Sequence, residues 1–325
     1  MLSRREFIER STKFAIGAGV GFGLEEKILL AQLQSGANQT PVASEQSATV
    51  PTGKIGPLKV SRLICGGNLI GGWAHSRDLI YVSELFKAYN TEAKIIETLQ
   101  LAEEKGINTI IVNPSSLTVL KKYWGEYGGK IQAIVEGHPK LDDVKTNIQS
   151  SVDSGASAIY IQGGVCDWWV EQGKVDMLGK ALEVIKGNGL PCGLGAHVMK
   201  TTKACVEAGL EVDFFVKTLH GTNYWSWKRP GQPDSVIANP ADNYFCPEPE
   251  ATIEFMKNIS KPWIAFKVLA AGAIHPSDGF KYAFQNGADF ICVGMFDFQI
   301  REDVAIAKNV IAELWGKKRP RPWRA

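Results

Sequence analysis

The stretch Leu101-Ala-Glu-Glu-Lys-Gly-Ile-Asn-Thr-Ile-Ile-Val-Asn113 contains the end of an amphipathic helix, a glycine and a short apolar run. Gly106 stands where a helix end favours positive φ, and the run after it is apolar enough for a parallel strand buried on both faces. The same order recurs along the chain. The predicted strands are Arg62–Asn68, Asn108–Asn113, Ile131–His138, Ala158–Gln162, Cys192–Val198, Asp213–Leu219, Pro262–Leu269 and Phe290–Met295. The predicted helices are Glu92–Lys105, Leu117–Glu126, Asp142–Ser154, Met177–Asn188, Thr201–Ala208, Glu248–Ile259, Ser277–Gln285 and Glu302–Leu314.

Alternation of eight apolar strands with eight helices predicts a (β/α)8 TIM barrel. An open doubly wound sheet is the alternative, but no G-x-G-x-x-G motif follows the first predicted strand. We expect the barrel to occupy residues 52–325 as a single domain. The connection after the sixth strand, from His220 to Cys246, is long for such a loop, and its length predicts a lid or a binding element.

The first residues differ from the rest in composition. Ser3-Arg4-Arg5-Glu6-Phe7-Ile8 places two arginines before an apolar pair, and residues 14–24 form a short apolar core rich in Gly and Ala. This arrangement resembles a twin-arginine export signal over residues 1–37, and an amphipathic helix of a cytoplasmic protein is the alternative. The resemblance implies the twin-arginine translocon as a partner and a periplasmic or otherwise exported location. Residues 38–51 are polar and are expected to form a linker.

The charge balance limits the classes of partner. The chain has 325 residues, and 36 Lys and Arg against 34 Asp and Glu leave a formal charge of +2. A surface that binds nucleic acid normally shows a cationic excess, so nucleic acid is not an expected partner. No apolar run approaches the roughly 20 residues that cross a bilayer, so the sequence predicts no transmembrane span.

Five residues form the predicted catalytic set, because reactive groups of TIM barrels lie at the carboxyl ends of the strands. Glu136 and His138 are two residues apart near the end of the third strand, so they share a face. His197 ends the fifth strand, and Lys217 and Lys267 stand within the apolar sixth and seventh strands. A lysine there must find a carboxylate or a ligand, or titrate as a neutral amine. We expect both lysines to point inward and one of them to pair with Glu136.

Binding residues are expected at the other strand ends and on the rim loops. Aromatic faces at a barrel mouth suit stacking against sugar rings, with amides and carboxylates for the hydroxyl groups. Packing of these aromatic residues within the loops, or in a dimer contact, is the alternative. The predicted binding residues are Asn68, Trp73, Asn113, Gln162, Trp168, His220, Asn223, Tyr224, Trp225 and Asp242.

A divalent metal is one candidate cofactor. Glu136, His138 and His197 have the ligand types of a zinc, manganese or iron site, and such a metal could activate a carbonyl oxygen. Their positions on separate strands do not by themselves identify a metal site.

One stretch after the linker resembles the opening of the aldo/keto reductases: Gly53-Lys-Ile-Gly-Pro-Leu-Lys-Val-Ser-Arg-Leu-Ile-Cys-Gly-Gly67. That family uses an Asp-Tyr-Lys-His tetrad with a nicotinamide. Asn113 stands at the Asp position here, and no tyrosine follows it at the usual short spacing. Glu136 and His138 occupy the region of the Lys, and Gln162 occupies the position of the His. The resemblance therefore implies the barrel without the tetrad, and a nicotinamide is less expected than a metal.

Three functions follow from these features. The first is an exported enzyme that acts on a carbohydrate-like carbonyl compound by acid/base proton transfer, as isomerases, epimerases and lyases do. The second is an aldo/keto-type oxidoreductase with altered catalytic residues. The third is a glycan-binding barrel without catalysis. A small molecule or a glycan is the expected ligand in each case.

Overall fold

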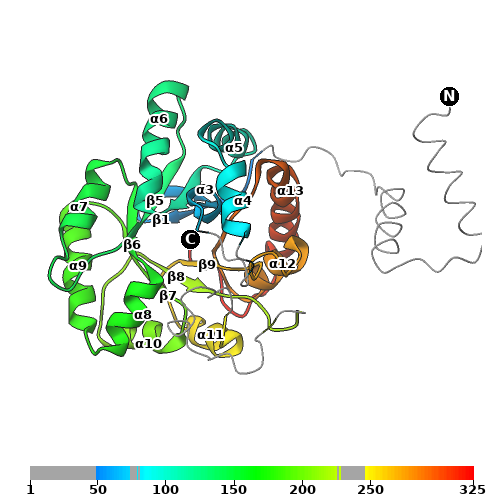
Figure 1. Cartoon of the computed structure of the whole chain (residues 1–325). Coiled ribbons are helices and arrows are strands. Elements are labelled where there is room, and N and C mark those ends of the chain that lie inside the picture. The colour runs from blue at the N-terminus through cyan, green and yellow to red at the C-terminus, as the bar shows by residue number, and fades with distance from the viewer. Residues whose placement is uncertain (1–48, 74–78, 80, 225–226, 228–245) are drawn as a thin grey trace, which may run out of the picture. The chain divides into compact units, whose positions relative to one another are not determined.

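Eight parallel strands close into a barrel in the order β10-β3-β4-β5-β6-β7-β8-β9 (Figure 1). The computed structural model describes residues 49–73, 79, 81–224, 227 and 246–325. The predicted export signal 1–37, residues 38–48 of the predicted linker and residues 228–245 of the predicted lid lie outside the described residues.

Each barrel strand lies inside the range predicted for it, and each pairs in parallel with both neighbours. The (β/α)8 prediction is therefore confirmed. The strands are β3 (Leu63–Gly66), β4 (Thr109–Val112), β5 (Gln132–Gly137), β6 (Ala158–Ile161), β7 (Cys192–Ala196), β8 (Phe214–Thr218), β9 (Trp263–Phe266) and β10 (Phe290–Val293).

The strands separate two apolar layers, because successive side chains point to opposite faces. On β8, Phe214 and Val216 belong to the smaller layer inside the barrel, together with Tyr160 and Ile264. Phe215 belongs to the larger layer between the strands and the helices. The same alternation decides which side chains near each strand end reach the barrel mouth.

All eight predicted helices are present, and they surround the barrel (Figure 1). They are α5 (Glu92–Glu104), α6 (Leu117–Tyr127), α7 (Thr146–Asp153), α9 (Val175–Gly187), α10 (Met199–Glu207), α11 (Pro249–Met256), α12 (Pro276–Gln285) and α13 (Asp297–Leu314). The helix predicted from Asp142 begins only at Thr146. The reason is a turn in which the Asp143 carboxylate accepts hydrogen bonds from the N–H groups of Lys145 and Thr146, at 3.1 and 3.0 Å.

Several elements were not predicted. They are the antiparallel hairpin of β1 (Thr52–Ile55) and β2 (Leu58–Ser61), the helices α3 (Asn68–Gly71), α4 (Val82–Tyr89) and α8 (Gly163–Glu171), and the 3₁₀ turn Pro114–Ser116. Helix α8 begins directly after β6, where the side chain of Gln162 caps it by accepting a hydrogen bond from the N–H of Val165. Among the helices of the described ranges, none combines the length and apolar content that a bilayer span requires.

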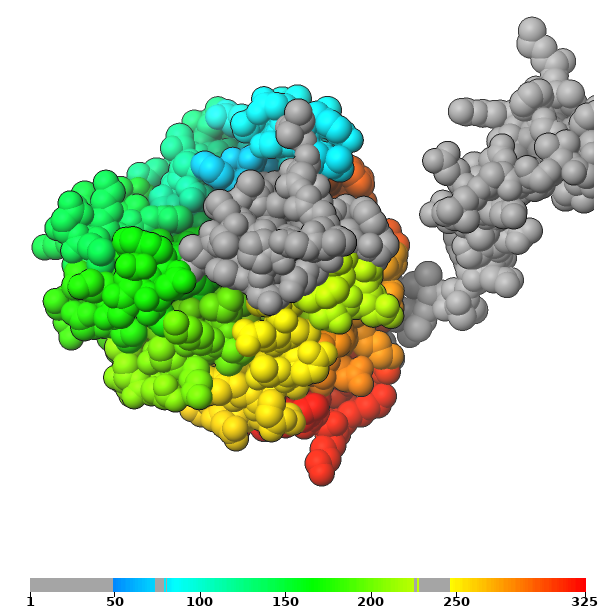
Figure 2. Space-filling model, turned by 60° about the horizontal axis from the view of Figure 1, so that its bottom comes forward, coloured from blue at the N-terminus to red at the C-terminus, as the bar shows by residue number. Residues whose placement is uncertain are grey.

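The face seen in Figure 2 reflects the closed barrel. Its coloured parts follow one another in chain order, from cyan through green and yellow to orange. This order is expected when consecutive strand and helix units surround one axis.

The amino-terminal end of the barrel contains buried charged side chains. Arg321 and Asp289 form an ion pair at 2.5 Å, and both side chains are 0% exposed. Arg321 also donates to the carbonyl oxygen of Gly287, and Arg62 donates to that of Asp289. These contacts connect Arg62, which precedes β3, with Asp289, which precedes β10.

Candidate active site

Polar side chains of three neighbouring strands meet at the carboxyl end of the barrel. The hydroxyl of Tyr160 on β6 donates to Oε1 of Glu136 on β5 at 3.1 Å. The other carboxylate oxygen of Glu136 lies 3.4 Å from Nε2 of His138. The same Nε2 lies 3.3 Å from the amide nitrogen of Asn113, which follows β4. The structure thus brings together three predicted site residues and adds Tyr160 to them.

Nε2 of His138 lies between a hydrogen-bond donor and an acceptor. The amide nitrogen of Asn113 is a donor and favours a bare Nε2 on His138, whereas the Glu136 carboxylate favours a proton between the two groups. The amide cannot reverse without losing the bonds that its oxygen accepts from the N–H and hydroxyl of Ser115, at 3.1 and 2.9 Å. A pair placed in this way can take up or release a proton as a general acid or base.

Tyr160 is the fixed donor in this group. Burial, and after it the charge of Glu136, raises the pKa of the Tyr160 phenol well above its ordinary value. The phenol therefore keeps its proton and continues to donate to Glu136 at any pH near neutrality.

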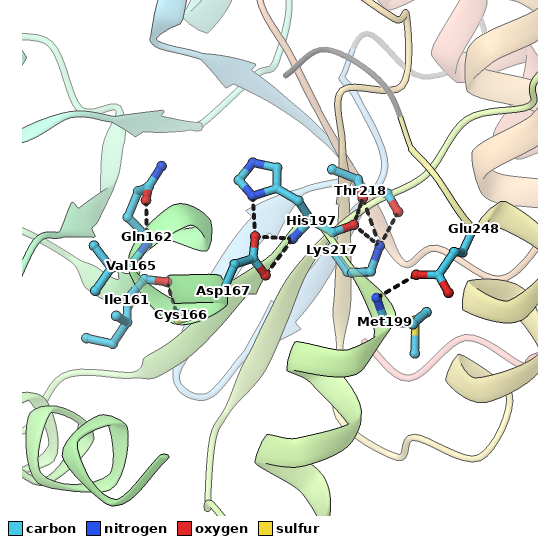
Figure 3. A network of polar contacts seen from close by, with 10 residues as sticks. All are labelled: Ile161, Gln162, Val165, Cys166, Asp167, His197, Met199, Lys217, Thr218 and Glu248. Atoms are coloured by element: carbon cyan, nitrogen blue, oxygen red, sulfur yellow. Dashed lines mark hydrogen bonds and ion pairs between the residues drawn. The ribbon is translucent and has the colours of Figure 1, made fainter. Parts of the chain in front are cut away.

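The second part of the site is a buried pair of His197, just past β7, and Asp167 of α8. Nδ1 of His197 lies 2.7 Å from Oδ2 of Asp167, and the backbone N–H of His197 donates to both carboxylate oxygens (Figure 3). The two side chains are 3% and 0% exposed. Because a carboxylate accepts, Nδ1 carries the proton and Nε2 keeps its lone pair. Nε2 points away from Asp167 and makes no hydrogen bond within the described part of the chain.

The charge state of His197 follows from its surroundings. Burial lowers the pKa of the imidazole below its ordinary value of 6.5, and the positive charges of Lys267 and Lys217 lower it further. The bond to Asp167 opposes this shift without reversing it. His197 is therefore neutral at pH 7, with a lone pair on Nε2 that can accept a proton.

Lys217 does not point into the barrel, and this prediction is wrong. Phe214 and Val216 occupy the inward positions of β8, so Lys217 shares the helix-facing side with Phe215. For the same reason Lys217 is not the lysine that was expected to pair with Glu136.

The ammonium of Lys217 bonds instead to neutral oxygens at the ends of β7 and β8. It donates to the carbonyl of His197 at 2.8 Å and to the hydroxyl and carbonyl of Thr218 at 2.8 and 3.3 Å (Figure 3). Burial lowers the pKa of Lys217, and the charges around it, Asp167 among them, oppose that shift. Lys217 thus connects two strand ends behind His197.

Lys267 and His197 both lie near the Phe266 ring, and strand alternation does not place Lys267. Its φ of +58° is in the left-handed region that residues other than glycine rarely adopt, so strand alternation ends at Phe266. The ammonium lies 5.8 Å from the centre of the Phe266 ring, and that ring lies 5.3 Å from the ring of His197. The charge of Lys267 consequently acts on the imidazole.

Four predicted binding residues lie in the connections that follow β3 and β6. Asn68 begins α3 and Trp73 follows that helix, and both are exposed. Gln162 uses its side chain to cap α8. Trp168 lies within α8 rather than on a loop, and it is 43% exposed. Their roles in binding stay predictions.

The residues after β8 pack on one another. The ring of His220 is buried and lies 5.5 Å from that of Tyr224 and 6.2 Å from that of Trp227. Asn223 is exposed beside them. These contacts are ring packing within the connection after β8. A role of these residues in binding stays a prediction. Two more predicted binding residues lie outside the described residues: Trp225 and Asp242.

The predicted metal site at Glu136, His138 and His197 is not formed. Where the structure describes the chain, no three His, Cys, Asp or Glu side chains are placed to hold a metal ion. His197 is turned toward Asp167, whereas Glu136 is engaged by Tyr160 and His138.

Two residues of the site were missed, and each had a signal in the sequence. Tyr160 is two residues before Gln162 on one strand, so alternation places both on the inward face. Asp167 is a lone carboxylate within Val165-Cys-Asp-Trp-Trp169, and an acid in so apolar a stretch needs a buried partner. The sequence pattern predicts a loop here, and an acid in an exposed loop needs no buried partner.

No protein-family model matches the chain, and no curated protein matches it. Solved structures do. One proposed aldo-keto reductase from Pseudomonas aeruginosa is 17% identical with a TM-score of 0.55, over 80% of this chain and 94% of that one. Another is 15% identical with a TM-score of 0.58, over 82% and 98%. A phospho-2-dehydro-3-deoxyheptonate aldolase from Thermotoga maritima is 14% identical with a TM-score of 0.49, over 82% and 74%. Likeness at such identity to the two Pseudomonas structures shows the shared barrel fold.

Proposed function

We propose that the chain is an enzyme that transfers a proton beside the carbonyl group of a sugar-like compound. The observation that carries this proposal is the buried pair of Asp167 and His197, which orients a neutral imidazole with an unused lone pair. A neutral imidazole held by a carboxylate is the kind of group that acts as a general base near pH 7.

The first step would be removal of a proton from the carbon next to the carbonyl. Nε2 of His197 forms the new N–H bond, the electrons of the broken C–H bond form a C=C bond, and the carbonyl π electrons move to oxygen. The resulting enolate oxygen is negative. Lys267 supplies a positive charge close enough to act on His197, and such a charge stabilises the enolate. No net electrons are gained or lost, so the step needs no redox partner.

The second step would use Glu136 and His138. A proton donated by this pair to the same carbon from the other side gives epimerisation. A proton donated to the former carbonyl carbon gives isomerisation, in which the proton of the adjacent hydroxyl moves to the enolate oxygen. A proton given to a hydroxyl that leaves as water gives elimination. Tyr160 holds Glu136 in place throughout, because its phenol stays protonated.

Exchange of the substrate proton with solvent tests this proposal directly. Candidate sugars are incubated with the protein in D₂O, and NMR follows deuterium at the carbon beside the carbonyl. His197→Gln should slow exchange by about 10²–10⁴-fold, the usual contribution of a general base. His275→Asn is the matched control, since His275 caps α12 and asparagine is also a good cap. Equal exchange by wild type and His197→Gln would overturn the proposal.

We also propose that the protein acts outside the cytoplasm. The support is the pair Arg4-Arg5 before a short apolar core. Changing both arginines to lysine should retain folded protein in the cytoplasm, as measured by fractionation. Retention of the wild-type protein in the cytoplasm would contradict the proposal, and unchanged export of the double variant would contradict the twin-arginine route.

Carbonyl reduction with a nicotinamide is the second candidate, favoured by the fold shared with proposed aldo-keto reductases. TIM barrels frequently bind phosphate at the loops after the seventh and eighth strands. In the loop after β9, however, the N–H groups of Ala270, Gly272 and Ile274 already donate to backbone carbonyls of the same loop. These three N–H groups are not available to a dinucleotide phosphate, and we derive no step through a nicotinamide. Turnover of simple aldehydes with NADPH at about 1–10³ per second would make carbonyl reduction the preferred function, ahead of proton transfer.

A further inference from the structure

A cavity of about 480 Å³ opens beside the candidate site, at the carboxyl ends of β5 and β6. Pockets that bind small ligands have volumes of roughly 300–1,000 Å³, so one sugar ring is well within its capacity. The cavity is lined by Pro139, Lys140, Leu141, Gln162, Gly164, Val165, Trp168 and Trp169.

This cavity adjoins His197 through the start of α8. A Cβ atom on Gly163 would lie 2.8 Å from Cε1 of His197, so the backbone there touches the imidazole. The neighbours of that glycine on either side, Gln162 and Gly164, line the cavity. Helix α8 thus holds the base through Asp167 and the cavity wall through Trp168 (Figure 3 shows the Asp167 side).

The lining has the chemistry of a site for an anionic sugar. Trp168 is 43% exposed and offers a flat apolar face, on which a sugar ring can stack. Lys140 is exposed and is the one charged side chain among the lining residues, all of which the structure describes. Gln162 and the backbone at Gly164 supply polar groups between them.

We propose that this cavity binds the non-reacting part of a sugar substrate that has a negatively charged group. The ring lies against Trp168, and the anion, a carboxylate or a phosphate, pairs with Lys140. This inference rests on the proposed proton-transfer function, and it narrows the substrate from sugar-like compounds to anionic sugars.

Calorimetric titration of the full chain with glucuronate, glucose 6-phosphate and glucose tests the assignment. At least one anionic sugar should bind more tightly than glucose, and which one does so identifies the anion. Lys140→Gln should reduce that preference by about two- to fivefold, the range for an exposed ion pair, and Lys140→Arg should keep it. Trp168→Ala should weaken binding of all bound sugars by roughly tenfold, and Trp168→Phe should recover part of the loss.

Two controls complete the test. Lys121 lines a separate cavity of about 410 Å³ near the amino-terminal end of the barrel, so Lys121→Gln should bind as wild type does. His275→Asn should also bind as wild type does, because His275 caps α12 and lies outside the lining. Failure of all three sugars to bind, equal affinity for glucose and both anions, or unchanged binding by Trp168→Ala would overturn the assignment. If His197→Gln exchanged deuterium at the wild-type rate, His197 would not be the base. The binding of anionic sugars by the cavity would not be affected by that result.

Discussion

The two ends of the barrel both contain buried charges, and they use them differently. At the amino-terminal end, the guanidinium of Arg321 meets the carboxylate of Asp289 at 2.5 Å, and that carboxylate also accepts from the N–H groups of Trp263 and Arg324. At the carboxyl end, Asp167 and His197 are equally buried and bonded at 2.7 Å. There, however, one ring nitrogen is left without a partner in the described chain.

The comparison shows that burial of charge does not by itself identify a functional site. A charge whose hydrogen-bonding capacity is used within the fold positions elements relative to each other. A buried group that keeps one unused donor or acceptor beside an opening can act on a ligand. By this criterion the Asp167–His197 pair fits the proposed catalytic role, whereas the Asp289–Arg321 pair is structural.

Replacing Asp167 by asparagine should have the largest effect on activity. The amide can donate to Nδ1 of His197, which would move the proton to Nε2 and remove the base. We expect a loss of about 10²–10⁴-fold in kcat, measured by the deuterium-exchange assay. The free energy of unfolding should change little, since the two side chains stay hydrogen-bonded to each other. Full activity in this variant would place the base elsewhere.

The opposite pattern is expected for Asp289→Asn. Loss of the carboxylate leaves Arg321 buried without its counter-charge, which typically costs about 3–5 kcal/mol of stability. Denaturant unfolding measures this loss, and kcat of the folded protein should be unchanged. Replacing Arg321 and Asp289 together by apolar residues should cost less than the single change. If Asp289→Asn reduced kcat at unchanged stability, the division between the two ends would be wrong.

The pH dependence sharpens the assignment of His197. Because burial lowers its pKa, the imidazole stays neutral until the pH falls below 6.5, and only then does the base become protonated. The acid limb of kcat/KM should therefore lie below 6.5. The unfolded chain takes up this proton first, so the associated stability is present above 6.5 and declines as the pH falls below that value. An acid limb above 6.5 would contradict a neutral, desolvated histidine.

The barrel and part of the site can be predicted from the sequence. What could be predicted differs from residue to residue, for physical reasons. Apolar strands of a closed barrel alternate with little ambiguity, so Glu136 and His138 were placed on one face and do meet. Asp167 could not be placed, because its role depends on α8, a helix outside the eight regular units. The position of Lys267 could not be predicted either, because its left-handed backbone ends the strand alternation.

Lys217 is the residue on which sequence and structure differ most. An apolar strand in a barrel has two buried faces, so a lysine within it reads the same whether it points to the barrel interior or to the helices. The layers around β8 decide the question, since Phe214 and Val216 fill the interior side. The sequence therefore predicts that Lys217 is buried, but it does not decide whether the side chain points to the barrel interior or to the helices.

Lys217→Met should consequently have the smallest effect of these changes. The variant loses three hydrogen bonds to neutral oxygens, each with a net value of about 0.5–1.5 kcal/mol. It also loses a buried ammonium whose desolvation costs several kcal/mol, and the two terms largely offset each other. The carbonyl of His197 keeps its bond from the hydroxyl of Thr218 at 2.9 Å, so His197 should stay in place. We expect the free energy of unfolding to change by less than about 1 kcal/mol, the scale of a single hydrogen bond, with nearly unchanged kcat. A large loss of kcat at unchanged stability would instead show that Lys217 acts on the substrate and that the catalytic site extends behind β8.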